Sequence, residues 1–154
     1  MKMSAIAIDP ERRELGAWVK EIPELPGVEL KVRGSDCAEA RKLRASLIEQ
    51  IPRQKRLRGK ISQDDRDEIE TAVLHRVLLQ DWRGIEDDDD KPEPYSKDKA
   101  LAYLTDPRFT LFRNGVIWAT NIVAEDQEAG AEADAGNSSK PSAGKSSGAT
   151  GKRS

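Results

Sequence analysis

The chain has 154 residues and a formal net charge of -2, the size of one ordinary domain, which argues against a multidomain machine. Hydrophobic residues make up 36% and charged residues 35%, which is typical of a small, well-solvated fold rather than an enzyme with a large core. No apolar run approaches the roughly 18 residues that span a bilayer, and the start lacks a signal-peptide stretch, so we expect a cytoplasmic protein. The single cysteine, Cys37, cannot form an internal disulfide and fits a reducing compartment.

Charge divides the chain into two halves. Residues 1–60 hold 14 Lys and Arg against 9 Asp and Glu, and residues 61–124 hold 8 against 14, so the halves carry +5 and -6. This polarity favours packing of one half on the other, or head-to-tail contact between copies. Self-association therefore stays open.

The domain boundaries follow from composition. We assign residues 1–13 to a flexible N-terminus and residues 14–124 to a single α+β domain. Residues 125–154 are rich in Ala, Gly and Ser and contain no large apolar side chain. Such a segment cannot offset the entropy lost on ordering, so we predict a disordered tail.

The domain opens with a predicted β-hairpin. Apolar and polar residues alternate over residues 28–33, which is the period of a strand with one buried face. Residues 17–22 form the expected partner strand, and a turn rich in Pro and Gly over residues 23–27 joins the two. Because an isolated hairpin is marginal in water, we expect helices to cover it.

A first helix is predicted after the hairpin. Ser35 or Asp36 can cap it, with Glu39 in capping-box spacing after Asp36, and Pro52 ends it. Its expected apolar stripe consists of Ala40, Leu43, Leu47, Ile48 and Ile51.

A second helix is predicted from a cap at Ser62 as far as Trp82. Its apolar residues point in several directions, which places it in the middle of a bundle. Gly84 is expected to end it in a left-handed conformation, with Ile85 closing the hydrophobic contact of that cap.

Two further helices are predicted toward the end of the domain. Ser96 can cap a short third helix, and Asp106 with Pro107 starts a fourth. At 100° per residue the fourth helix has two apolar faces. One consists of Phe109, Phe112, Val116, Thr120 and Val123, and the other of Leu111, Trp118 and Ile122.

The predicted fold is therefore α+β and mainly α, with an N-terminal β-hairpin packed on about four helices. Gly115 inside the fourth helix costs roughly 1 kcal/mol relative to Ala. Either the helix bends there, or another segment packs closely against it.

No motif predicts catalysis, a cofactor or a metal site. His75 is the only histidine, and its place on a helix face is more typical of a packed residue than of a catalyst. The acidic run from Asp87 to Asp90 fails the EF-hand pattern, because its sixth position is Pro92 and its twelfth is Asp98. We therefore expect a protein that is not an enzyme and has no metal or cofactor.

A basic segment leaves nucleic-acid binding open as an alternative. Five positive charges within eight residues can neutralise phosphates, but no aromatic residue accompanies them for base stacking. We expect instead an exposed connection that faces the acidic second half or an acidic partner. The five residues are Arg53, Lys55, Arg56, Arg58 and Lys60.

The second apolar face of the last helix is the candidate partner site. Leu111, Trp118 and Ile122 either pack inside the bundle or form a groove for a partner helix. Trp118 is the sharper candidate, because tryptophan commonly anchors interfaces.

In order and spacing, residues 14–123 resemble the tail assembly chaperones of long, non-contractile-tailed phages and related prophages. The likeness rests on the segment from Trp18 to Arg33, an Asp-Trp-Arg-Gly turn, an acidic loop with Pro-Tyr-Ser, and Leu-Thr-Asp-Pro-Arg-Phe before the last helix. Its distinctive residues are Asp81, Trp82, Gly84, Pro94, Tyr95, Asp106, Pro107 and Phe109.

The resemblance implies a chaperone that transiently binds the tape-measure protein and helps the major tail protein assemble around it. It also implies a location in the host cytoplasm, absence from the mature virion, and a longer product made by ribosomal frameshifting near the end of the reading frame. The alternative is a structural tail or head-completion protein that stays in the virion.

Overall fold

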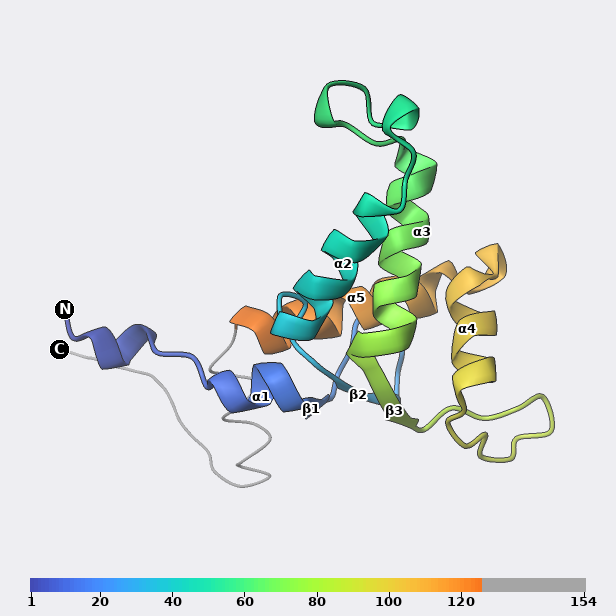
Figure 1. The fold of residues 1–154 in the computed structure, drawn as a ribbon. Coiled ribbons are helices and arrows are strands. Elements are labelled where there is room, and N and C mark those ends of the chain that lie inside the picture. The colour runs from blue at the N-terminus through green and yellow to red at the C-terminus, as the bar shows by residue number, and fades with distance from the viewer. Residues whose placement is uncertain (126–154) are drawn as a thin grey trace, which may run out of the picture.

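The computed structural model describes residues 1–125, without the side chain of Leu57, and the predicted tail beyond Glu125 lies outside the described residues. The fold is α+β and mainly helical, as predicted (Figure 1). The main elements are α1 (Pro10–Leu15), β1 (Ala17–Val19), β2 (Glu29–Val32), α2 (Ala38–Glu49), α3 (Gln63–Val73), β3 (Leu79–Arg83), α4 (Lys97–Thr105) and α5 (Thr110–Glu125).

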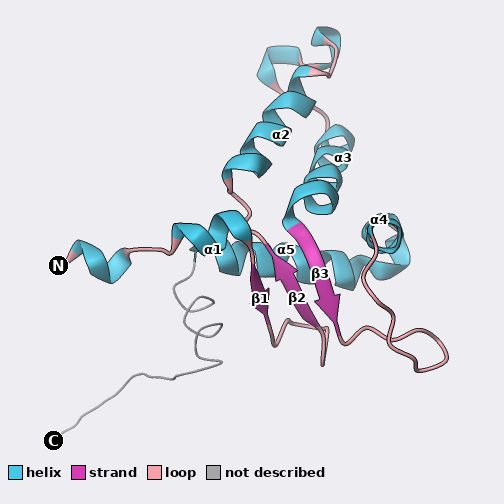
Figure 2. Ribbon diagram, turned by 60° about the horizontal axis from the view of Figure 1, so that its bottom comes forward, coloured by secondary structure: helices cyan, strands magenta, loops and turns pink. Residues whose placement is uncertain are grey.

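The predicted hairpin is confirmed and forms two strands of an antiparallel sheet in the order β1-β2-β3. Ala17 pairs with Val32, and Val19 pairs with Leu30. These four side chains are at most 5% exposed. They occupy the sheet face that α5 crosses, so the period-2 alternation marks the buried face correctly (Figure 2).

The inner face of α5 completes this core. Val116, Ala119 and Thr120 are at most 1% exposed, and Phe112 and Val123 are also buried. At Gly115 a Cβ atom would lie 2.5 Å from Leu25 Cδ1. The turn after β1 therefore packs directly on α5, which is the close-packing alternative predicted for this glycine.

The second predicted helix does not reach Trp82. Regular α3 ends at Val73, a π-helical turn covers Leu74–Leu78, and β3 then pairs antiparallel with β2. Gly84 is left-handed, with φ of 85°, but it follows a strand rather than a helix. The prediction of one long helix was therefore wrong over residues 79–82.

A bulge explains why the pattern was misleading. Val32 pairs with Leu79, whereas Lys31 pairs with Asp81, so Gln80 is an extra residue in β3. Because of this extra residue, Leu79 and Trp82 are both buried although they lie three positions apart. A spacing of three is the signature of a helix, and here a bulged strand produces it.

The cap of α2 also differs from the prediction. Its N-cap residue is Cys37, which makes no side-chain capping bond, and Glu14 Oε1 accepts the hydrogen bond from the Ala38 backbone nitrogen at 2.9 Å. Glu39, the expected partner in a capping box, instead accepts a bond from Arg33 at 2.6 Å. A carboxylate from α1 therefore caps α2 in place of Ser35 or Asp36.

Helices α2 and α3 form an arm that stands away from the sheet (Figure 1). Arg44 joins them by donating two hydrogen bonds to the Glu70 carboxylate, at 2.8 and 3.3 Å. Ile48, expected on the buried stripe of α2, is 38% exposed because the arm covers only part of that stripe. Ser62 caps α3 as predicted, accepting from the Asp65 nitrogen.

The predicted starts of the last two helices are confirmed. Ser96 accepts from the Lys99 nitrogen at α4, and Asp106 accepts from the Arg108 nitrogen. Residues Pro107–Phe109 form a 3-10 turn before α5 begins. In the N-terminal segment, sequence reasoning missed α1, which Asp9 caps. None of the helices within residues 1–125 combines the length and apolar character needed to cross a membrane.

We expect Gly84→Ala to destabilise the protein more than Gly59→Ala. Both glycines have positive φ, so each substitution costs about 1–2 kcal/mol in backbone conformation. Only at Gly84 would the new Cβ atom also collide with a backbone atom, the carbonyl oxygen of Gly27. Urea unfolding of both variants measures the difference, and equal losses would contradict this close approach.

We also expect Glu14→Ala to lower the free energy of unfolding by about 1 kcal/mol, because it removes the cap of α2. Ser35→Ala is the matched control and should change stability little, since its hydroxyl makes no capping bond. Thermal unfolding of both variants tests the assignment. A larger loss of stability in Ser35→Ala would show instead that Ser35 caps α2, as expected from the sequence.

Candidate protein-binding site

The outer face of α5 carries the predicted partner residues. Leu111 is 53% exposed and Trp118 is 37% exposed, while Ile122 is half-buried. Spacings of seven and four residues place the three side chains along one side of the helix. Leu111 and Trp118 therefore lie at the surface of α5 and do not pack inside the bundle.

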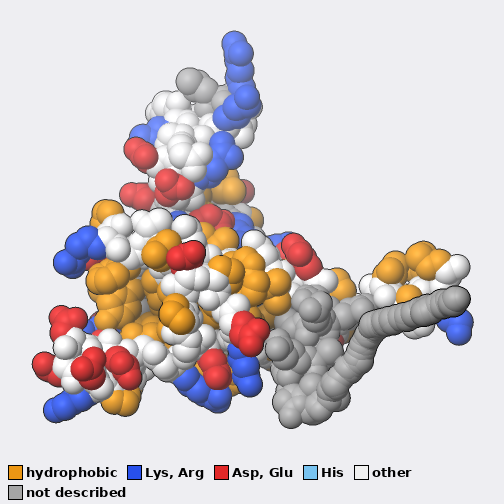
Figure 3. Space-filling view, turned by 180° about the vertical axis from the view of Figure 1, so that it is seen from behind, with side chains coloured by type: hydrophobic (Ala, Val, Ile, Leu, Met, Phe, Trp, Pro, Cys, Tyr) orange, Lys and Arg blue, Asp and Glu red, His pale blue; other side chains and the backbone are white. Residues whose placement is uncertain are grey.

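Apolar surface extends beyond these three residues. Phe109, in the 3-10 turn that precedes α5, is 36% exposed, and Ile117 is half-buried. Seen from behind, hydrophobic side chains gather over the middle of the body and charged ones surround them (Figure 3). Exposed Asn114 and Asn121 interrupt the stripe with polar groups. A patch of this composition is typical of a protein-binding surface.

An aromatic cluster lies at the Phe109 end of α5. Trp82 packs edge-on against Tyr95, with ring centroids 5.0 Å apart, and against Phe112 at 5.9 Å. Tyr103 bridges to Phe109 at 5.0 Å. The Trp82 indole nitrogen donates a 2.7 Å hydrogen bond to the Glu93 carbonyl oxygen. Strand β3 is thereby joined to α4 and α5, which follow it later in the sequence.

The other residues of the distinctive motif stabilise turns of the chain. Asp81 accepts from the Trp82 backbone nitrogen, and Gly84 approaches the Gly27 carbonyl closely. Asp106 caps the turn that Pro107 begins, and its bonds from Arg108 lower the pKa of the Asp106 carboxyl. Pro94 is exposed beside Glu93. The residues of the distinctive motif therefore stabilise the fold. Most of them lie away from Leu111, Trp118 and Ile122, here called the Trp118 stripe.

Next to the cluster is a hollow of about 590 Å³, here called the aromatic hollow. Its floor is apolar and its edge is acidic, with Lys99 as the basic lining residue. The lining consists of Leu25, Val28, Gly84, Ile85, Glu86, Asp87, Asp88, Glu93, Lys99, Tyr103, Phe109 and Phe112.

Tyr103 is tied to the edge of this hollow. Its hydroxyl donates to the Glu93 carboxylate, with 2.9 Å to each oxygen, and Lys99 Nζ lies 3.5 Å from Glu93 Oε2. Burial first, and then the bond to Glu93, raises the pKa of Tyr103 to about 12. Tyr103 is therefore a neutral donor at any physiological pH, and it fixes the carboxylate.

The acidic loop, residues 86–90, borders the hollow. Asp87 Oδ1 accepts from the backbone nitrogens of Asp89 and Lys91, at 2.8 and 3.0 Å, which closes the loop. Within residues 1–125 no group of three or more Asp, Glu, His or Cys side chains is arranged to hold a metal ion.

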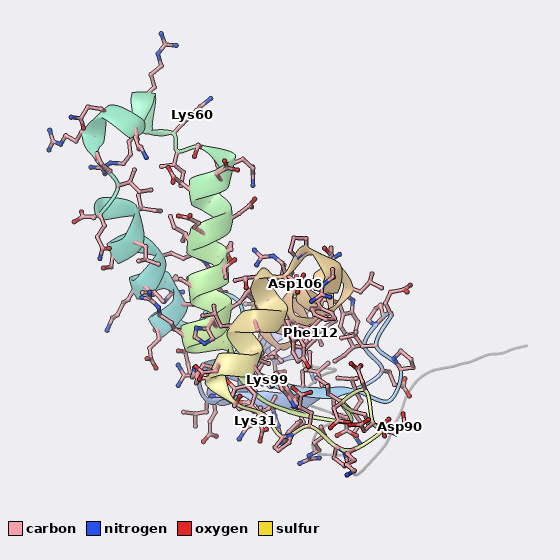
Figure 4. The ribbon with its side chains drawn as sticks, turned by 90° about the vertical axis from the view of Figure 1, so that its right-hand side faces the viewer. Lys31, Lys60, Asp90, Lys99, Asp106 and Phe112 are labelled. Carbon is pink, nitrogen blue, oxygen red and sulfur yellow. The ribbon has the colours of Figure 1, made fainter. Side chains whose placement is uncertain are left out.

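The basic segment, residues 53–60, forms the end of the α2–α3 arm and is here called the basic tip. Its described side chains are exposed, as predicted, except for half-buried Arg56. The tip and the acidic loop lie at opposite ends of the molecule, as Lys60 and Asp90 mark in Figure 4. The segment therefore does not face the acidic loop. Within the acidic second half it adjoins α3, where Asp65 and Glu68 line a hollow together with Lys55, and the expectation of an acidic partner stays a prediction.

His75 lies in the π-helical turn. Its Nε2 is 2.9 Å from the Lys97 carbonyl oxygen, and Lys97 Nζ donates to the His75 carbonyl oxygen at 2.8 Å. These two contacts join the turn to the start of α4. The arrangement has the geometry of a packing contact between elements.

Sequence reasoning missed Glu93 and Tyr103 as parts of a surface hollow. Tyr103 follows Ala100 by three residues on the apolar side of α4, which was a usable signal. For Glu93 the sequence contains no such signal, because its position depends on an isolated bridge between Glu86 and Pro92 that folds the loop back.

Comparison with known proteins gives one family. A model of the family described as YdaY prophage protein matches residues 35–137, which is 103 of the 154 residues. The match spans α2 to α5, including the basic tip, the Trp118 stripe and the lining of the aromatic hollow apart from Leu25 and Val28. No curated protein and no solved structure matches the chain. The chain therefore belongs to the YdaY prophage protein family and is a phage-related protein.

Proposed function

We propose that this prophage protein is a tail assembly chaperone that transiently binds an apolar helix of the tape-measure protein and promotes assembly of the tail tube. The observation that carries the proposal is the apolar stripe of α5, exposed Leu111 and Trp118 with half-buried Ile122, on a helix whose other face is used in the core. The prophage family and the order of motifs along the chain support it.

The stripe has the dimensions of a helix-binding surface. From Leu111 to Ile122 it runs eleven residues, about 16 Å at 1.5 Å per residue. A partner helix meets such a surface with apolar residues spaced three, four and seven apart. Trp118, near the middle of the stripe, is the expected anchor.

The composition of the face suits release as well as binding. Exposed Asn114 and Asn121 border the apolar residues, so the partly wet stripe lacks the wide apolar core of an obligate interface. A chaperone must let its client go, and a modest interface dissociates faster than a large one.

The proposal includes a site of action and an alternative. The chaperone works in the host cytoplasm, acts together with the major tail protein, catalyses no reaction, and is left out of the finished particle. A structural tail or head-completion protein would instead remain in the virion. Mass spectrometry of purified particles separates the two, since stoichiometric recovery of the chain would exclude the chaperone role.

We expect Trp118→Ala and Leu111→Ala to weaken binding of tape-measure fragments to the full chain. Loss of an interface tryptophan costs about 2 kcal/mol, which is roughly thirtyfold in Kd. Ile48→Ala is the matched control, because Ile48 is 38% exposed but lies on α2. Titration calorimetry measures all three variants, and thermal unfolding checks that each is folded.

Two results would contradict the proposed site. Equal binding by Trp118→Ala and the unaltered chain would remove the anchor. An equal loss in Ile48→Ala would show that the effect is not local to α5.

A further inference from the structure

The basic tip carries positive charge that the described residues leave without an ion pair. Within residues 1–125 its five cations, Arg53, Lys55, Arg56, Arg58 and Lys60, take part in no ion pair, whereas Arg33, Arg44 and Arg83 each pair with a carboxylate. The Nε of Arg56 is buried and has no hydrogen-bond partner there. The tip is thus a protruding group of cations outside any ion pair of the described residues, with Asp65 and Glu68 lining a hollow beside Lys55.

The aromatic hollow has the opposite character. Glu86, Asp87 and Asp88 line its edge and form no ion pair among the described residues. Its floor includes the rings of Tyr103, Phe109 and Phe112. Carboxylates above aromatic rings suit a guanidinium or ammonium group, because the rings attract cations and accommodate their aliphatic stems.

This chain already uses the same pairing elsewhere. The Arg83 guanidinium lies 3.7 Å from the centre of the Trp18 ring and also pairs with Glu29 at 3.2 Å. Arg108 lies 5.3 Å from the centre of the Phe109 ring and pairs with Asp106. Arginine between a ring and a carboxylate is therefore a recurring contact of this surface.

Within one chain the two sites do not meet. The tip stands at the far end of the α2–α3 arm, and the acidic loop lies beyond α4 at the other end (Figure 4). In the same view Lys99 and Phe112 lie on the side of the acidic loop, far from Lys60. Among the described residues these opposite charges are unpaired within one molecule, and they can pair between molecules.

We propose that the protein associates head to tail, with the basic tip of one copy docked in the aromatic hollow of the next. The occupant is a second copy because the chain itself carries the complementary group, on an arm that projects far enough to enter a neighbour. The contact uses different surfaces on its two sides, so it closes into a ring or continues as a filament. The contact does not use the Trp118 stripe, so the test of this proposal is independent of the test of client binding.

Sedimentation velocity of the full 154-residue chain at 50 and 500 mM NaCl tests the proposal. At low salt the weight-average sedimentation coefficient should rise with protein concentration. At high salt it should fall toward that of a monomer, because salt screens exposed charges. A chain that stays monomeric at low salt up to millimolar concentration would overturn the proposal.

Charge reversal locates the contact. Tip reversal (Arg53→Glu, Arg56→Glu and Arg58→Glu) and edge reversal (Glu86→Lys and Asp88→Lys) should each abolish association. The chain that carries both reversals should regain it, because the pairs are restored with their signs exchanged. This recovery is an outcome that misfolding cannot produce.

The matched control carries Lys20→Glu, Lys42→Glu and Arg76→Glu. These three exposed residues lie outside both sites, and their reversal changes the net charge by the same amount as tip reversal. The control should associate normally. Loss of association in the control, no recovery in the combined variant, or association that forms only when duplex DNA bridges the tips would each overturn the proposal.

Discussion

The packing of α5 across one face of the sheet is the constraint on which the rest of the structure depends. Val116 and Thr120 meet the face formed by Leu30 and Val32, and all four side chains are at most 1% exposed. Burying one side of an amphipathic helix fixes the direction of the other side. Leu111 and Trp118 face outward because the opposite residues are committed to the core, and the proposed client surface is therefore a consequence of core packing.

Local signals in the sequence were sufficient for the elements that local chemistry determines. The alternation in β2, the serine caps of α3 and α4, and the Asp106-Pro107 start were all read correctly, since each depends on residues a few positions apart. The Glu14 cap of α2 spans 24 positions and had no local signal. Strand β3 was missed for a different reason, since its bulge imitates the spacing of a helix.

The same distinction between local and long-range determinants applies to the candidate site. The two faces of α5 follow from helical geometry alone, and the structure agrees with that division. Which face is covered depends on where the sheet lies, and periodicity does not contain that information. The aromatic hollow needs the segment after β3, α4 and α5 together, so its residues could be named from sequence only singly, as Gly84, Phe109 and Phe112 were.

The extra residue at Gln80 also limits how this chain can change in length. Its side-chain nitrogen donates to the Leu15 carbonyl oxygen at 3.1 Å, which ties the bulge to the end of α1. Adding a residue between Leu79 and Trp82 would swap inward and outward positions in β3 and turn Trp82 toward water, whereas deleting Gln80 would restore regular pairing and remove the tie to Leu15. Insertions among relatives should therefore be rare in this segment and collect in the acidic loop, where pairing with β2 has already ended.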